Sequence, residues 1–167
     1  DHIAPAGAKV LPYRSNIEKL STFVFENNKP HFDEVCKENN GGIIVAGENY
    51  GQGSSREHAA INPMYLGVKA VIAKSIARIH KGNLVNHGII PMLFANPADY
   101  DRIDQEDEIE FENLLDQIPT RKVTVKDKTK DFSFEVTLDL SDNEVEVVLS
   151  GGQLSYLKEQ LAKGETK

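Results

Sequence analysis

The sequence has 167 residues, of which 40% are hydrophobic and 27% charged, a balance ordinary for a globular protein. Its 19 basic and 26 acidic residues give a net charge of −7, which disfavours non-specific binding to nucleic acid or to an anionic membrane. No apolar run approaches the ~20 residues of a membrane span. The length suits a single domain, residues 1–167, that buries roughly 70% of its unfolded surface.

The single cysteine and the start of the chain indicate where the protein works and how it is made. Cys36 excludes an intramolecular disulfide and points to a reducing compartment, so we expect a cytoplasmic protein. The chain begins at Asp1 without an initiator methionine, a basic region or an apolar leader. We therefore expect a fragment of a longer polypeptide, or a chain from which a leader has been removed.

The first forty residues predict irregular chain followed by two short helices. Apolar residues recur at helical spacing from Ile17 onward, and Ser15 or Asn16 can cap this helix. Two asparagines and two glycines, residues 39–42, stop the second helix. The predicted elements here are a short strand at 9–11 and helices at 17–26 and 31–38.

The middle of the chain alternates short apolar runs with helical segments. The runs predict buried strands at 43–46, 70–73 and 89–94, and the segments between them predict helices at 56–66 and 76–86. This order is typical of a parallel sheet with helical crossovers. Ligands of such sheets bind beyond the carboxyl ends of the strands, where the loop at 47–55 lies.

The last third of the chain predicts antiparallel strands and a closing helix. Period-two alternation marks strands at 123–125, 132–138 and 145–149, and a helix follows Gly151 and Gly152 with three leucines on one stripe. Residues 101–112 hold seven acidic side chains, which we interpret as a solvated strand edge rather than a metal site. The fold class is therefore α/β, with a small parallel sheet, helices and an antiparallel sheet in three layers.

A glycine-rich turn joins the first apolar run to the following helix. Its glycines, which permit positive φ and close approach of the backbone to a bound group, are Gly47, Gly51 and Gly53. Ser54 and Ser55 are natural N-cap residues, and Arg56 adds charge to the positive end of the helix dipole. The turn predicts a small site for a carboxylate or phosphate, although many such turns only reverse the chain. The spacing matches neither a Rossmann fingerprint nor a P-loop.

Three stretches of the sequence resemble one protein family. The first is NYGQGSSREHAA at 49–60, the second is KSIARIHKGNLVNHGIIP at 74–91, and the third is the opening Asp1-His2-Ile3 with Arg14 downstream. The first stretch resembles the active-site loop in the C-terminal swivel domain of aconitases and their relatives, and the likeness covers most of residues 1–105. It implies a swivelling β/β/α domain.

The resemblance also implies a chemistry, namely the hydro-lyase interconversion of citrate and isocitrate through cis-aconitate. By its place in the motif, Ser54 matches the family's catalytic base. Asp1 and His2 resemble a pair near the site that handles the hydroxyl. The residues that match carboxylate-binding positions, or the turn beside them, are Arg14, Gly53, Ser55 and Arg56.

The family's Lewis acid is the iron of a [4Fe–4S] cluster held by three cysteines. This chain has Cys36 alone and no CxxC pair, so we expect no cofactor or metal in it. The resemblance therefore implies that other aconitase domains, in the same polypeptide or in a large subunit, carry the cluster and complete the active site around a tricarboxylic acid.

Two alternatives share part of this evidence. One is the small subunit of an isopropylmalate or homoaconitate isomerase, and the other is an RNA-binding regulator. Arg14 favours a tricarboxylic acid, because a guanidinium pairs with a third carboxylate but not with the alkyl group of isopropylmalate. The net negative charge and the lack of a basic cluster with aromatic residues count against RNA.

Four of the histidines are interpreted as structural or solvated. His58 lies at the start of a helix and is expected to orient the loop. His80 and His87 are seven residues apart on one helix face, with no acidic residue nearby in sequence to complete a metal site. We interpret both as structural and His31 as solvated.

Overall fold

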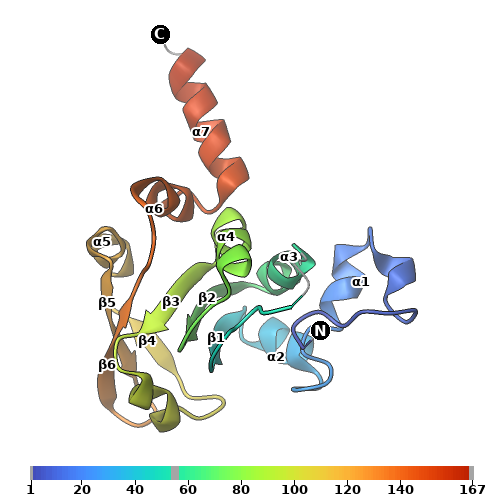
Figure 1. Ribbon diagram of the computed structural model, residues 1–167, viewed down its shortest axis with the longest axis horizontal. Helices are drawn as coiled ribbons and strands as arrows, with labels where there is room; N and C mark the ends of the chain where they lie inside the picture. The colour runs from blue at the N-terminus through green and yellow to red at the C-terminus, as the bar shows by residue number, and fades with distance from the viewer. Residues whose placement is uncertain (1, 54–56, 166–167) are drawn as a thin grey trace.

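The computed structural model describes residues 2–53 and 57–165, and its centre is one six-stranded sheet with the order β1-β2-β3-β6-β5-β4 (Figure 1). The strands are β1 Gly42–Ala46, β2 Val68–Ala73, β3 Ile90–Phe94, β4 Ile109–Phe111, β5 Lys122–Asp127 and β6 Phe132–Thr137. The α-helices are α1 Ile17–Ser21, α2 Phe32–Glu38, α3 His58–Tyr65, α4 Arg78–Asn86, α5 Leu114–Gln117, α6 Asp142–Leu149 and α7 Gln153–Glu165. Across the described part of the chain, no helix is long and apolar enough to cross a membrane.

The first three strands are parallel, as predicted, and α3 and α4 connect them. The centre of β2 pairs on both sides, with Val71 opposite Ile44 of β1 and Pro91 of β3. β3 also pairs antiparallel with β6. The parallel and antiparallel parts, expected as two sheets, are therefore joined in one mixed sheet. The α/β class is confirmed.

The hydrophobic core divides between the two faces of the sheet. Side chains alternate along a strand, so Ile72 joins one cluster and its neighbour Val71 joins the other. The first cluster collects the apolar residues of β3, β5, β6 and α6, and the second collects those of α2, α3 and the N-terminal segment. Only Ile44 of β1 is buried, because β1 is an edge strand, whereas a wholly buried strand was predicted.

The N-terminal segment differs from the prediction in two places. The strand at 9–11 is wrong, because the backbone turns at Gly7, whose carbonyl accepts from the amides of Val10 and Leu11. A 3-10 turn at Leu11–Tyr13 follows. The first helix is capped by Asn16, as predicted, but it ends at Ser21 rather than at 26. It stops early because the amides of Thr22, Phe23 and Val24 donate to carbonyls three residues back rather than four. Phe25 then leaves the helical path with a φ of 54° and donates its amide to the carbonyl of Ile3.

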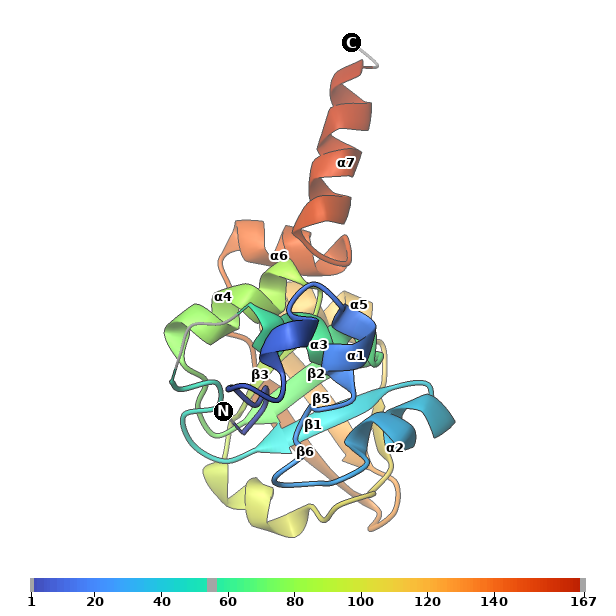
Figure 2. The same ribbon diagram turned by 90° about the vertical axis from the view of Figure 1, so that its right-hand side faces the viewer.

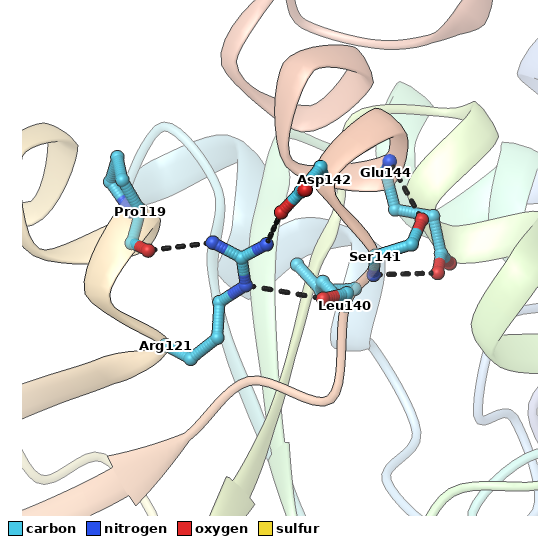
Figure 3. Close-up of polar contacts among 6 residues, drawn as sticks. All are labelled: Pro119, Arg121, Leu140, Ser141, Asp142 and Glu144. Carbon is cyan, nitrogen blue, oxygen red and sulfur yellow. Dashed lines mark hydrogen bonds and ion pairs between the residues drawn. The ribbon is translucent and has the colours of Figure 1, made fainter.

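The strand predicted at 145–149 is wrong, because these residues form α6. Ser141 opens this helix with a capping box. Its hydroxyl accepts from the Glu144 amide at 3.2 Å, and the Glu144 carboxylate accepts from the Ser141 amide at 3.1 Å (Figure 3). Arg121 holds the same turn by donating to the Leu140 carbonyl and the Asp142 carboxylate. The alternating valines satisfy a helix equally well once Val148 is counted with them.

Replacing Ser141 by alanine should lower the free energy of unfolding by about 1 kcal/mol, because the Glu144 amide at the start of α6 loses the hydroxyl that accepts from it. Chemical denaturation of the isolated chain measures this. Ser155→Ala is the matched control, since Ser155 is exposed on α7 and alanine is the better helix former. Equal losses for the two variants would contradict the role of the capping box.

The edge strand β4 and the last helix α7 form exposed parts of the molecule. β4 forms the opposite edge of the sheet from β1, as expected for the acidic run, and Lys130 pairs with Asp104 and Asp107 of the preceding turn at 2.7 and 2.9 Å. α7 is the predicted closing helix and projects away from the sheet (Figures 1 and 2). Its leucine stripe is therefore mostly exposed rather than packed.

Candidate functional site

The glycine-rich loop after β1 is fixed at its first half by the turn between β2 and α4. The amide of Asn49 donates to the Ser75 hydroxyl at 2.7 Å, and the amide of Tyr50 donates to the Ser75 carbonyl at 3.0 Å. The amide of Ala77 returns a bond to the Tyr50 carbonyl at 2.9 Å. These bonds hold the loop at the carboxyl end of the parallel strands, where the sequence placed it.

Beneath this loop lie two buried aromatic rings. Tyr50 and His80 meet edge to face with ring centroids 5.1 Å apart. Burial lowers the pKa of His80 to about 4 and raises the pKa of Tyr50, so both are neutral near pH 7. Among the described residues, neither Nε2 of His80 nor the hydroxyl of Tyr50 finds a hydrogen-bond partner. His80 is thus a packing residue of the loop, in agreement with its structural interpretation.

Gly51 rests directly on the His80 ring. Its φ is +81°, and a Cβ at this position would lie 2.2 Å from the ring. Only glycine fits both the left-handed backbone and the contact. The glycine that the sequence associated with ligand approach is here required by packing beneath the loop.

Gly51→Ala should destabilise the protein by about 1–3 kcal/mol, because the left-handed backbone is strained and the His80 ring must move. Gly82→Ala is the control within α4, where an added Cβ meets nothing within 4 Å and the change should be neutral or stabilising. Thermal unfolding of the two variants tests the difference. A Gly51→Ala variant as stable as Gly82→Ala would show that the loop does not rest on His80 as described.

The second half of the loop meets α3. This helix begins at His58 with Glu57 at its N-cap position. The predicted caps Ser54 and Ser55, together with Arg56, lie outside the described residues, as does Asp1. His58 is half-buried at the helix start, where it was expected to orient the loop.

A side-chain hydrogen bond that sequence reasoning missed joins Glu57, just before α3, to α4. Oε1 of Glu57 lies 2.9 Å from Nε2 of His87, the C-cap residue of α4. His87 therefore has the acidic neighbour that its sequence surroundings lack. Thirty residues separate the two, so no spacing rule connects them. By contrast, His31 is solvated as predicted and pairs with Glu34 on α2.

The remaining predicted site residues lie in two places. Exposed His2 helps to line a groove of about 1750 Å³ that also takes in residues 47–52, β1 and the acidic segment 101–108. Gly53 follows residues 47–52 of the loop, is exposed and has a φ of +129°. Arg14 ends the 3-10 turn at Leu11–Tyr13, is exposed, and does not line the groove. The structure thus places His2 and residues 47–52 on the same groove, whereas Arg14 lies outside it.

The donor set of the chain does not fit a [4Fe–4S] cluster. Such a cluster needs three cysteine ligands here, and the sequence has only Cys36. Cys36 is buried in α2, and burial followed by the charge of Asp33 raises the pKa of its thiol, which disfavours the thiolate that binds metal. Within residues 2–53 and 57–165, no group of three histidine, cysteine, aspartate or glutamate side chains gathers around a possible metal position.

Comparisons with known proteins identify relatives of this chain. Residues 17–97 match the family model of the aconitase C-terminal domain. A probable mitochondrial aconitate hydratase of Dictyostelium discoideum is 45% identical over 125 residues, which cover 72% of this chain and 16% of the relative. A mitochondrial homocitrate dehydratase of Saccharomyces cerevisiae is 31% identical, covering 94% of this chain and 23% of the relative. A 3-isopropylmalate dehydratase from Methanocaldococcus jannaschii superposes with a TM-score of 0.80 and 33% identity, covering 100% of this chain and 90% of its own.

These relatives are named hydratases and dehydratases, so fold and motif together define a hydro-lyase superfamily. The chain belongs to the aconitase family, as its C-terminal swivel domain. It spans about a sixth of the length of the aconitate hydratases it matches.

The expectation of a cytoplasmic protein was wrong. Aconitate hydratases from Dictyostelium discoideum and Caenorhabditis elegans, 45% and 44% identical to this chain, are named as mitochondrial. The inference failed because one unpaired cysteine indicates a reducing environment without identifying the compartment.

Proposed function

We propose that residues 1–167 form one domain that completes the active site of an aconitate hydratase acting on citrate and isocitrate. The observation that carries the proposal is the serine motif at 49–60, whose described part is held at the carboxyl end of the parallel sheet by Ser75 and His80. Similarity to aconitate hydratases across 72% of the chain supports it.

In this proposal Ser54 removes the carbon-bound proton while Ser55, Arg56 and the Gly53 backbone hold substrate carboxylates. Arg56 suits this role because its guanidinium can form a bidentate pair with a carboxylate. A serine hydroxyl is a weak base, and a helix N-terminus shifts a pKa by roughly one unit at most. Ser54 therefore needs neighbouring cations and a site closed to water. Asp1 and His2 would assist at the substrate hydroxyl.

The cluster that we propose for the complete enzyme belongs to residues outside this chain, because one cysteine cannot provide its ligands. The side of the groove lined by residues 101–108 is unsuited to the substrate itself. Its acidic side chains would repel a tricarboxylate. The substrate would instead lie between the serine motif and the cluster-bearing domains, which are the proposed partners.

Homocitrate is the second candidate substrate, since a homocitrate dehydratase is 31% identical over nearly the whole chain. Isopropylmalate is the third candidate substrate, supported by the superposition on the archaeal 3-isopropylmalate dehydratase. Arg14 separates the tricarboxylates from isopropylmalate, because only the former present a third carboxylate to a guanidinium.

The proposal is tested by assaying the purified complete enzyme on three unsaturated acids. These are cis-aconitate, its homologue with one more methylene, and the isopropylmalate counterpart. The double bond absorbs ultraviolet light and its loss reports hydration. The highest kcat/KM is expected with cis-aconitate, and the isolated chain should hydrate none of them. Hydration of the isopropylmalate counterpart alone would overturn the aconitate assignment.

A further inference from the structure

The described residues on either side of Ser54, Ser55 and Arg56 both contact α4. On the amino side, Tyr50 and Gly51 rest on His80, in the first turn of α4. On the carboxyl side, Glu57 meets His87, at the last turn of α4. The described flanks of the loop thus contact opposite ends of α4, through a first anchor built by packing and a second built by a side-chain hydrogen bond.

The α4 end of the second anchor is rigid. The amide of His87 donates to carbonyls of the last helical turn, and its side chain is only 19% exposed. The next residue, Gly88, fits so closely against Gly151 that an added Cβ would lie 2.4 Å from the Gly151 carbonyl oxygen. The imidazole therefore presents its Nε2 from a fixed base, and little side-chain entropy is lost when it binds Glu57.

An ordinary surface ion pair would not have these properties. His31 and Glu34 show the contrast, since their side chains are 74% and 64% exposed and lie 3.3 Å apart at the start of one helix. Such pairs contribute little to stability. The Glu57–His87 pair is shorter, joins two helices across thirty residues, and ends at the N-cap residue of the helix that follows the serine motif. Its effect should therefore be on the position of that helix start more than on the stability of the fold.

We propose that Glu57 and His87 are a positioning pair that fixes the start of α3 against the end of α4 and so sets the placement of the serine motif. This inference rests on the proposed function, in which Ser54 and Arg56 act on the substrate. With hydrogen on Nε2, the imidazole donates to the carboxylate whether it is neutral or charged. Neither residue needs to touch the substrate.

The test uses the complete enzyme with Glu57→Ala, His87→Ala and the double variant. Each single change should lower kcat by about 10- to 100-fold, because a displacement near 1 Å in an active site has effects of this size. The double variant should be no worse than the singles, since the two residues act as one unit. His87→Gln should retain activity within about threefold, because its amide can donate to Glu57 in place of the ring.

Two readouts separate positioning from a structural role. The melting temperature of the Glu57→Ala variant should match that of the parent, since Glu57 is 61% exposed. Amide hydrogen exchange in a peptide covering residues 51–60 should become about tenfold faster, because the anchor no longer suppresses local opening. The matched control is Glu34→Ala, which breaks the solvated pair on α2 and should alter neither readout.

The outcomes are distinguishable. If Ser54→Ala abolishes turnover while Glu57→Ala leaves kcat and exchange unchanged, the positioning pair is wrong and the proposed function stands. If Glu57→Ala speeds exchange but Ser54→Ala leaves turnover unchanged, the anchor exists and the proposed function falls. If His87→Gln lowers kcat as much as His87→Ala does, the proposal is also overturned, because restoring a hydrogen-bond donor would then not restore activity.

Discussion

Ser54→Ala is expected to lower kcat of the complete enzyme by about 10²–10⁴-fold and to leave KM nearly unchanged. A general base acts only in the transition state, so its loss should appear in kcat rather than in substrate binding. Steady-state kinetics on isocitrate and on cis-aconitate measure both constants. The melting temperature of the variant checks separately that the fold is retained.

Arg56→Lys provides the contrast for Ser54→Ala within the same motif. An ammonium keeps the charge but cannot form the bidentate fork to a carboxylate, so KM should rise strongly while kcat changes less. The assignment of roles would fail if both variants changed KM alone, or if both changed kcat alone by similar factors.

Arg14→Leu should lower kcat/KM for isocitrate by roughly 10- to 100-fold, the value of a hydrogen bond to a charged group. Activity on isopropylmalate should fall less or rise, since leucine suits an alkyl substituent. The side chain is exposed in this chain and outside the groove, so its proposed partner is a substrate held against other domains. The prediction therefore concerns the assembled enzyme.

Lys158→Leu is the control for the charge change, because Lys158 is exposed on α7, which projects away from the sheet (Figure 2). It should leave both activities unchanged. Unchanged isocitrate activity in Arg14→Leu would remove the basis for choosing a tricarboxylate.

The parallel half of the fold could be predicted because its signals are local. Continuous apolar runs such as Val71–Ala73, separated by helices with glycine or asparagine at their ends, fit only a few arrangements. The failure at α6 has an equally local cause. Val145 and Val147 satisfy a strand, and the helix is decided by the Ser141–Glu144 capping box that period-two counting ignores.

The site could be predicted only as far as the motif itself extends. Its glycines and serines are contiguous in sequence, so resemblance finds them. Glu57 and His87 are brought together by the packing of α3 and α4, and nothing in the sequence around His87 indicates a carboxylate. For the same reason, the contact of Gly51 with His80 could not be inferred from its spacing in the loop.

The joint between β3 and β6 has a consequence for how this domain can change. It consists of the pairs Leu93–Thr137 and Phe94–Val136, followed by the bond from the Ala95 amide to the Glu135 carbonyl. All of the proposed site residues, and the whole stretch that matches the family model, lie before or at residue 97. The segment after it joins the first half at this short seam and again where Gly151 lies against Gly88, the residue next to His87. A change in the second half of the domain can therefore reach the proposed site through the end of α4.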